Sequence, residues 1–541
     1  MSAEPQGDRR RSWWGWGWED QALTESQTRE LAASLSQRFG VGLESRKAPV
    51  LASSLLRPSR ITPPDGLISI VDTSDHERAR HSYGRAYRDV VRASGGVLDN
   101  PPDAVLFPSD PADIARVFDW CSDAKIAVVP YGGGSSVVGG VEYRGEGGFD
   151  TWVSLDLTRL DQILEIDHTS RAARAQAGIL GPALEDHLRP HGLTFRHFPQ
   201  SFEFSSLGGW LATRAGGHYA TVYTHIDDLV ESMTVLTPAG ELRTRRLPGS
   251  GAGPSPDRLF LGSEGALGII TDAWIRLQSR PVYKAAAGVH FKEFRDGVAA
   301  SMALAQSGLY PTNCRLIDAI EAATFAGVRD GSNLLVLGFE SADHPVDIAM
   351  ERALELCADH NGSSPEGARI TTPGTEAGKR GDVVDSWRRA FLRAPYLRDA
   401  LVRMSVIVET FETACTWDAF DDLHSDVMDA ANAAVREVCG TGWVTCRFTH
   451  LYPDGPAPYF SVFGTGRRGS EVAMWDEIKS AVSDALQSAG GTITHHHAVG
   501  RDHLPWYQRQ IPELVRSSFA ATKDTLDPGG ILNPGVLIDQ Q

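Results

Sequence analysis

A glycine-rich segment in the first third of the chain has the residue types that bind a phosphate group. Tyr131-Gly132-Gly133-Gly134-Ser135-Ser136-Val137 follows the apolar run 126–130, which is typical of a buried strand. Glycines allow backbone N–H groups to converge, and together with serine hydroxyls they could surround a diphosphate. No lysine follows the glycines, which excludes a P-loop, and the spacing does not fit a Rossmann motif. Alone, the segment is also consistent with a simple glycine turn.

Two later segments have a similar composition. In 199–217, Gly208-Gly209 and Gly216-Gly217 bracket a short predicted helix whose start carries Ser205 and Ser206. The N-terminal end of such a helix can approach an anionic cofactor closely. In 262–270, glycines precede a β-branched strand. Each segment could be a tight turn, but the three together predict one dinucleotide site.

Three consecutive histidines, His495 to His497, form a second candidate for chemistry. We predict that they lie on a strand, so that His495 and His497 face one way and His496 the other. Metal binding is conceivable, but no further ligand stands at a conventional spacing and the HExxH pattern is absent. We therefore predict no metal site. The alternative to a chemical role is that the three histidines are ordinary surface side chains.

Composition narrows the class of protein. The 541 residues carry a formal net charge of -17, which argues against a general attraction to nucleic acid. The six cysteines are scattered without a CxxC pair, and no secretory signal precedes them, so we predict a cytoplasmic protein with reduced thiols. No run reaches the ~18 apolar residues of a membrane helix. At most, the protein would contact the inner face of a membrane peripherally.

The pattern of elements predicts an α+β fold in several parts. We expect a mostly helical segment over 1–100, an α+β domain over 101–280, a second α+β domain over 281–470 and a C-terminal segment over 471–541 that completes the active site. The start of the chain is unusually aromatic, with Trp13, Trp14, Trp16 and Trp18. We interpret these side chains as an anchor packed on the folded body; the alternative is a cluster that contacts lipid.

With these segments in hand, the chain resembles the vanillyl-alcohol-oxidase-like, or PCMH-type, family of FAD proteins. The matching strings are PYGGGSSV, EFSSLGGWLATRAGG, GSEGALGII and DPGGILNPG. Within that family it is most similar to the alkylglycerone-phosphate synthases (alkyldihydroxyacetonephosphate synthases), on the strings WWGWGW, CRLID, PYLRD, FETACTWD, TCRFTHLY and THHHAVG. The resemblance extends from about Trp13 to Leu537 and implies a two-subdomain FAD-binding domain with an α+β cap domain that binds substrate.

The resemblance also implies which residues contact FAD. They are Tyr131, Gly132, Gly133, Gly134, Ser135, Ser136, Val137, Gln200, Ser201, Phe202, Glu203, Phe204, Ser205, Ser206, Thr213, Arg214, Ala215, Gly216, Glu264, Gly265, Ala266, Leu267, Gly268, Ile269 and Ile270. Ser135 replaces the threonine usual in the synthases, and Gly216 replaces a serine of the animal relatives. The glycine-rich loop has no histidine to which the flavin could be tethered, so we predict non-covalent FAD.

By the same resemblance, the reaction exchanges the acyl group of acyl-dihydroxyacetone phosphate for a long-chain fatty alcohol through a flavin N5 adduct. Tyr459 would be the base, with a pKa lowered by nearby positive charge. His496, His497 and Arg315 would complete the catalytic set, and Arg398 and His495 would bind substrate. Alternatively, Tyr459 is a strand aromatic, Arg315 pairs with Asp318 and Arg398 pairs with Asp399.

A second function remains open because relatives with other substrates share the FAD motifs. An FAD-linked 2-hydroxyacid dehydrogenase or oxidase is the main alternative, and a non-catalytic flavoprotein that binds acyl lipid is a third. Burial of a ~16-carbon chain at ~0.8 kcal/mol per CH₂ would contribute about 12 kcal/mol, so an apolar tunnel is expected to provide most of the affinity for a lipid substrate. By analogy with the synthases we expect a homodimer.

Overall fold

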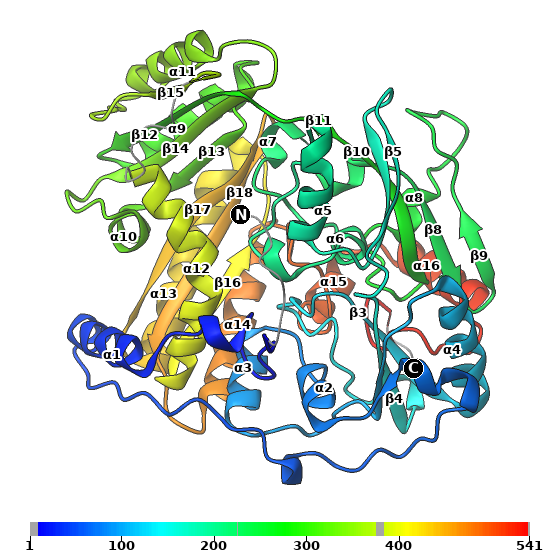
Figure 1. Cartoon of the computed structure of the whole chain (residues 1–541). Helices are drawn as coiled ribbons and strands as arrows, with labels where there is room; N and C mark the ends of the chain where they lie inside the picture. The colour runs from blue at the N-terminus through cyan, green and yellow to red at the C-terminus, as the bar shows by residue number, and fades with distance from the viewer. Residues whose placement is uncertain (1–8, 224, 375–382, 539–541) are drawn as a thin grey trace.

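The computed structural model describes residues 9–223, 225–374 and 383–538 of the chain. Helices and strands alternate through the described residues. The strands form a four-stranded and a five-stranded sheet on one side of the molecule and a seven-stranded sheet on the other, and β7 and β11 form a further two-stranded sheet (Figure 1). This arrangement confirms the predicted α+β class. Short elements outside the three larger sheets are α2 (Asp75–Arg80), α3 (Tyr87–Ser94), α7 (Ala220–Tyr223), α8 (Asp257–Phe260), β7 (Leu193–Thr194) and β11 (Gln278–Ser279).

The first sheet presents the glycine-rich loop. Its order is β1-β2-β4-β3, and both β2 and β3 run parallel to β4. Asp110 caps the helix that connects β2 to β3, and Pro111 occupies its first turn. The apolar side chains of β3 are buried, and the loop begins where that strand ends. The elements are β1 (Val71–Asp72), β2 (Ala104–Leu106), α4 (Pro111–Ala124), β3 (Ile126–Tyr131) and β4 (Thr151–Asp156).

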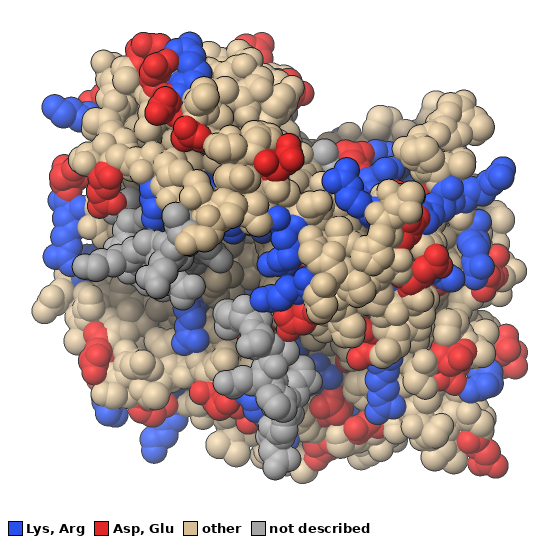
Figure 2. All heavy atoms as spheres, turned by 45° about the horizontal axis from the view of Figure 1, so that its top comes forward, with Lys and Arg blue, Asp and Glu red and all other residues tan. Residues whose placement is uncertain are grey.

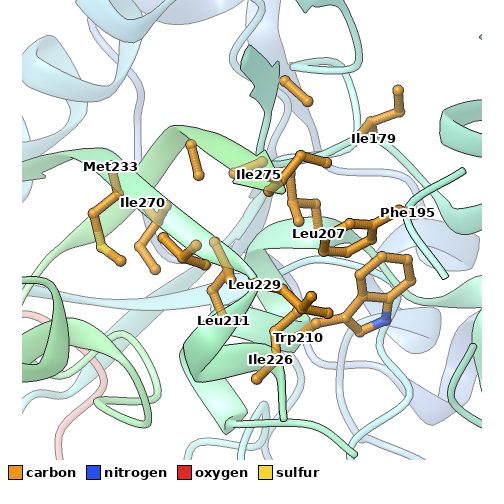
Figure 3. Packing of buried hydrophobic residues seen from close by; sticks show 14 of the residues in the cluster. Ile179, Phe195, Leu207, Trp210, Leu211, Ile226, Leu229, Met233, Ile270 and Ile275 are labelled. Atoms are coloured by element: carbon orange, nitrogen blue, oxygen red, sulfur yellow. The ribbon is translucent and has the colours of Figure 1, made fainter. Parts of the chain in front are cut away.

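The second sheet is antiparallel and supports the second glycine-rich segment. Helix α6 begins at Leu207, capped by the Ser206 side chain, and buries Leu207, Trp210 and Leu211 against the sheet (Figure 3). The sheet order is β5-β6-β10-β8-β9. The elements are β5 (Ile163–Asp167), β6 (Ala172–Gln176), α5 (Gly181–Leu188), α6 (Leu207–Thr213), β8 (Val230–Thr237), β9 (Gly240–Arg243) and β10 (Ile269–Arg276).

The large sheet has the order β15-β12-β14-β13-β17-β18-β16, and its neighbouring strands are antiparallel. Helices α13 and α14 pack their apolar side chains against one face, and α12 contacts the edge strand β16 and α3. The elements are β12 (Tyr283–Phe291), α9 (Phe294–Gln306), β13 (Asn313–Ile317), α10 (Ala319–Glu321), β14 (Asn333–Ser341), α11 (Asp347–Asp359), β15 (Arg369–Thr371), α12 (Val383–Arg403), β16 (Val406–Glu412), α13 (Phe420–Cys439), β17 (Gly442–Tyr452), β18 (Gly455–Thr465) and α14 (Glu471–Ser488).

The end of the chain returns to the first sheet. After α15 (Leu504–Gln510) and α16 (Glu513–Leu526), Leu532 forms a parallel bridge with Val128 of β3. Buried Lys523 donates to the carbonyls of Ala266 and Leu532 and pairs with Asp527. These contacts join the C-terminal residues to both smaller sheets.

The tryptophan-rich start packs on the folded body, as the sequence predicted. Trp13 and Trp16 are buried, and Trp16 contacts Phe204 edge to ring at 5.6 Å between centroids. Gly17 has a φ of 63°, and an added Cβ would lie 2.1 Å from the Tyr396 hydroxyl of α12. Helix α1 (Glu25–Phe39) also packs on α12. The burial of Trp13 and Trp16 removes the observation that favoured lipid contact by these two side chains.

The surface is mixed in charge. Figure 2 shows basic and acidic side chains interspersed over the face in view. Of the helices in the described part of the chain, none combines the length and the apolar character needed to span a bilayer.

Candidate active site

A cavity of about 350 Å³ lies between the smaller sheets and the large sheet. Its walls come from the loop after β3 and from α6 on one side, and from β16, β17, β18 and α12 on the other. Many of the residues predicted for the site line it: Gly132, Gly133, Gly134, Ser135, Ser136, Val137, Gln200, Ser201, Ser205, Ser206, Thr213, Ala215, Gly216, Arg315, Arg398, Tyr459, His496 and His497. Two sets of candidates from distant parts of the sequence therefore share one cavity.

The glycines of the first loop allow two chain segments to touch. A Cβ on Gly133 would lie 1.6 Å from the carbonyl oxygen of Phe204, and one on Gly132 would lie 2.3 Å from the Ser206 hydroxyl. Gly134 has a φ of 69°, in the left-handed region that favours glycine. The first two glycines are thus required by close approach within the protein, a reason that composition alone did not reveal.

The same loop fits an anionic group. Within the described residues, the backbone N–H groups of Gly133, Gly134 and Ser135 donate to no protein acceptor. Gly134 is buried, and Gly133 and Ser135 are half-buried at the cavity wall. Half-buried N–H groups without partners are a good site for phosphate oxygens. The N-terminal end of α6, with Ser205 and Ser206, lies on the same wall. The residues present therefore fit the diphosphate of a dinucleotide.

Other predicted cofactor residues do not line this cavity. They are Tyr131, Phe202, Glu203, Phe204, Arg214 and the segment Glu264, Gly265, Ala266, Leu267, Gly268, Ile269 and Ile270. Tyr131 is buried beneath the loop, and Arg214 pairs with Asp227 at 2.7 Å. Contacts of these residues with FAD remain predictions.

Glu264 joins the third segment to the chain beyond the histidines. Its carboxylate accepts hydrogen bonds from the N–H groups of Val499 and Gly500 at 2.9 Å each. Burial raises the pKa of Glu264 to about 7, and the two N–H donors offset only part of that effect. The segment 262–270 therefore positions the loop that carries His495 to His497 (the histidine loop) relative to the smaller sheets.

Strand pairing places the candidate catalytic side chains in one row across the large sheet. Glu412 of β16 stands opposite Tyr459 of β18, which stands opposite Arg447 of β17. Ile317 of β13 stands opposite Arg447, and Arg315 lies two residues earlier on the same face. Glu412 and Arg447 were not predicted, although both lie in strings that carried the resemblance. Single-sequence patterns could not reveal which strand pairs with which.

Tyr459 has the predicted positive neighbour but not the predicted pKa. The guanidinium carbon of Arg447 lies 3.9 Å from the centre of the Tyr459 ring. Burial raises the pKa of Tyr459 above its ordinary value and outweighs the lowering effect of Arg447. The expectation of a lowered pKa is therefore wrong for the protein alone, because the desolvation of a fully enclosed phenol is the larger effect.

The two predicted arginines occupy different walls. Arg315 is buried on β13, where burial and the charge of Arg447 lower its pKa to about 9. Asp318, its suggested partner, accepts instead from the N–H groups of Glu321 and Cys446. Arg398 of α12 donates to the carbonyl of Arg85 and pairs with Asp399 at 3.3 Å, while its Nε has no hydrogen-bond partner in the described part of the chain. Arg398 thus makes the alternative contact and still lines the cavity.

The three histidines lie on a bent loop, and the predicted strand is wrong. The N–H groups of His495, His496 and His497 all donate to the buried carboxylate of Glu412. His496 also pairs with Glu412 through Nδ1, and Nδ1 of His497 lies 3.6 Å from it. One carboxylate gathers the loop around itself, so the residues do not alternate as on a strand.

Electrostatics follow from this arrangement. Burial alone would raise the pKa of Glu412, but His496 and His497 in their protonated forms hold it well below its ordinary value. Burial lowers the pKa of His497 to about 4 and that of His495 to about 3. His495 bonds Tyr452 at 2.9 Å and does not line the cavity, so its role in substrate binding remains a prediction.

His450 is a further residue that the sequence did not single out. It is buried, lines the cavity and bonds the carbonyl of Gly217 through Nε2 at 3.0 Å. A side chain on Gly216 would meet His450 and His496, each 3.1 Å from the added Cβ. Ligand atoms of His450, His495 and His496, and those of Glu412, His496 and His497, come within 4.8 Å of one another. Most of them already take part in the hydrogen bonds described above.

The comparison with known protein families supports a flavin site in this cavity. A family model described as "FAD binding domain" matches residues 102–245, and one described as "FAD linked oxidases, C-terminal domain" matches residues 280–537. The fold and the glycine-rich loop thus define a flavoprotein of the PCMH type, and its cofactor is FAD.

Individual relatives define the family more narrowly. An alkyldihydroxyacetonephosphate synthase of Dictyostelium discoideum is 30% identical over 85% of this chain and 77% of its own length. The Caenorhabditis elegans synthase is 30% identical over 85% of this chain and 80% of its own. A solved alkyldihydroxyacetonephosphate synthase structure superposes with a TM-score of 0.80 at 24% identity, over 97% of this chain and 98% of that one. The chain belongs to the alkyldihydroxyacetonephosphate synthase family.

Proposed function

We propose that the protein is an FAD-dependent enzyme that exchanges the acyl group of acyl-dihydroxyacetone phosphate for a long-chain fatty alcohol. The products are the alkyl ether of dihydroxyacetone phosphate and a free fatty acid, with no net oxidation. The observation that carries the proposal is that Tyr459 lines the same cavity as the glycine-rich loop 131–137. FAD held by the glycine-rich loop would supply an electron-poor ring system that activates the substrate carbon.

The proton step is assigned to Tyr459. Tyr459 is buried and lines the cavity, so its phenolate form would be placed to accept the proton that leaves carbon 1 of dihydroxyacetone phosphate. His496 and His497 are held by Glu412 and line the same wall. They accept protons from the reacting oxygens and return protons to them. These roles are supported by the row across the large sheet.

Substrate binding divides between charged and apolar walls. Arg398 and Arg315 face the cavity and suit the phosphate and the leaving carboxylate. The alkyl chain is assigned to an apolar part of the wall formed by Trp16, Phe391, Leu397, Leu401, Val408 and Phe463. Each CH₂ placed there contributes ~0.8 kcal/mol, so chain contacts dominate affinity for a long-chain substrate.

A direct assay tests the proposal. The FAD-loaded protein is incubated with palmitoyl-dihydroxyacetone phosphate and hexadecanol in the absence of an electron acceptor, and ether product is measured by mass spectrometry. Ether formation with unchanged flavin absorbance supports the proposal. Bleaching of the flavin by lactate or glycolate, without ether formation, would instead support the 2-hydroxyacid dehydrogenase alternative.

The proposal extends to assembly and location. We infer a cytoplasmic homodimer with non-covalent FAD, whose lipid substrates come from a membrane that it contacts peripherally. The glycine-rich loop contains no histidine for a flavin tether. Release of FAD by acid precipitation, with the yellow colour in the supernatant, is the expected result for non-covalent binding.

A further inference from the structure

Arg447 is a buried cation of the cavity wall whose role has not been assigned. Its Nη1 lies 2.7 Å from Oε1 of Glu321, and its guanidinium carbon lies 3.9 Å from the centre of the Tyr459 ring. Only 8% of Arg447 is exposed, and Nε has no hydrogen-bond partner within the described residues. A buried guanidinium is costly unless its contacts compensate, so this placement requires a reason.

Backbone pairing fixes the contact between the cation and the phenol. Arg447 and Tyr459 are directly opposite each other on β17 and β18, so their side chains leave the same face of the sheet next to each other. Glu412 stands on the opposite side of Tyr459, on β16. Tyr459 is therefore held between a cation and an anion, and neither neighbour depends on a flexible loop for its position.

We propose that Arg447 is a positioning residue that orients the Tyr459 ring and stabilises the phenolate that the proton step needs, and that Glu321 limits how much of this charge Tyr459 experiences. The inference rests on the proposed function, in which Tyr459 is the base. Glu321 is 2% exposed and comes from α10, beside the row. Coulombic effects are stronger in such a poorly solvated place than in water.

The other charged and titratable groups around Tyr459 do not replace Arg447. Glu412 and Glu409 of β16 raise the pKa of Tyr459. The rings of His496 and His497 lie 6.2 and 5.6 Å from the Tyr459 ring. Burial lowers the pKa of His497 to about 4, which leaves this ring neutral at ordinary pH. Among the described residues, Arg447 is the cation stacked on the phenol.

The test measures the Tyr459 phenol directly. Protein loaded with FAD and labelled with ¹³Cζ-tyrosine is titrated by NMR between about pH 6 and about pH 10.5, and the resonance missing in Tyr459→Phe identifies the residue. We expect Arg447→Met to delay the onset of phenolate formation by about one pH unit or more, and Glu321→Gln to advance it. Arg447→Lys keeps a charge without the planar fork and should lie between wild type and Arg447→Met.

A second variant covers the case in which Arg447→Met does not fold, because that change leaves Glu321 buried and unpaired. Arg447→Met with Glu321→Gln removes both charges, and we still expect a later onset than in wild type because Arg447 is the closer group. An unchanged Tyr459 titration in the double variant would overturn the inference. So would shifts in the same direction for Arg447→Met and Glu321→Gln, since a merely structural role would not separate them.

The titration needs no turnover, which keeps the inference separate from the proposed function. If the phenol shifts as expected and no ether product forms, Arg447 tunes Tyr459 in an enzyme of another reaction. If ether forms and the phenol does not respond to Arg447, the proposed function stands and this inference fails. In an active enzyme, the acid limb of kcat/KM should move in the same direction as the phenol.

Discussion

The two walls of the cavity are built on different principles. The cofactor wall depends on missing side chains, because Gly132 and Gly133 let the first loop touch the segment of Phe204 and Ser206. The opposite wall depends on side chains that are present, because strand register sets Glu412, Tyr459 and Arg447 in one row. The first wall is defined by backbone shape and the second by side-chain charge.

This difference predicts how the walls fail. A change to the cofactor wall alters the backbone path and should remove FAD altogether. A change to Glu412, Tyr459 or Arg447 leaves the backbone in place. It should remove one chemical group while the protein still binds FAD and stays yellow. Substitutions in the two walls can therefore be separated by measuring FAD content and activity on the same sample.

The largest effect is expected for Gly133→Ala. The added Cβ would lie 1.6 Å from the carbonyl oxygen of Phe204, and backbone atoms cannot give way as a flexible side chain would. Overpacking of this kind typically costs about 1–3 kcal/mol, and occasionally more. We expect colourless protein with a lowered thermal midpoint, measured by absorbance and calorimetry. Gly42→Ala is the matched control, since no atom of the described residues lies within 4 Å of its added Cβ. Full FAD content in Gly133→Ala would refute the steric account of this wall.

Tyr459→Phe should separate the walls most cleanly. Removal of the hydroxyl deletes the proposed base while the ring and its packing remain, so we expect about a 100-fold or greater loss of kcat with normal FAD content. The measurement is ether formation per bound flavin. Tyr83→Phe is a suitable control, because that hydroxyl bonds the carbonyl of Val97 away from the cavity. Retained activity in Tyr459→Phe would assign the proton step to another group.

Glu412→Gln should have a smaller effect on the same wall. The carboxylate accepts from the N–H groups of His495, His496 and His497, and a neutral amide would hold the loop less firmly. Displacement of the two cavity-lining histidines should reduce kcat by about tenfold, because misplaced catalytic groups lose much of their effect. Soaked imidazole would not restore the rate, whereas the more conservative Glu412→Asp should recover part of it. Wild-type kinetics in Glu412→Gln would mean that the loop holds its own position.

The cofactor wall was more accessible from sequence than the catalytic wall. Residues 131–137 are contiguous, and glycine and serine content indicates a loop with close backbone approaches without knowledge of any partner. The residues Arg315, Glu412, Arg447 and Tyr459 come from different strands, and their proximity depends on pairings between segments far apart in the chain. No local pattern encodes such a pairing, so Glu412 and Arg447 were missed.

The histidine loop shows a related limit of sequence reasoning. We predicted that His495 to His497 lie on a strand, but the carboxylate of Glu412 binds successive N–H groups of the loop, which a strand would direct to alternating sides. A buried anion from another strand thus overrode the local preference. The pKa of Tyr459 was likewise misjudged because enclosure, which raises it, depends on the assembled fold.

The smallest expected effect concerns stability at acid pH, and it arises from the histidine loop of the catalytic wall. The pKa values of His495 and His497 are about 3 and about 4 in the folded protein, below the ordinary value near 6.5. The unfolded chain therefore binds protons that the folded chain does not, so the stability contributed by neutral histidines is complete above about pH 6.5 and is lost as pH falls toward the folded values. Each group changes the free energy of unfolding by at most about 1.4 kcal/mol per pH unit.

Replacement of His497 by Gln should flatten this dependence between about pH 6.5 and about pH 4, measured as the thermal midpoint of the FAD-loaded protein. Surface His187→Gln is the control, because its ring is exposed and bonds the carbonyl of Ala183 on its own helix, so this change should leave the slope unchanged. A slope that persists in His497→Gln would place the acid sensitivity elsewhere. In that case the histidine loop would contribute chemistry to the catalytic wall without the desolvation that its enclosed position predicts.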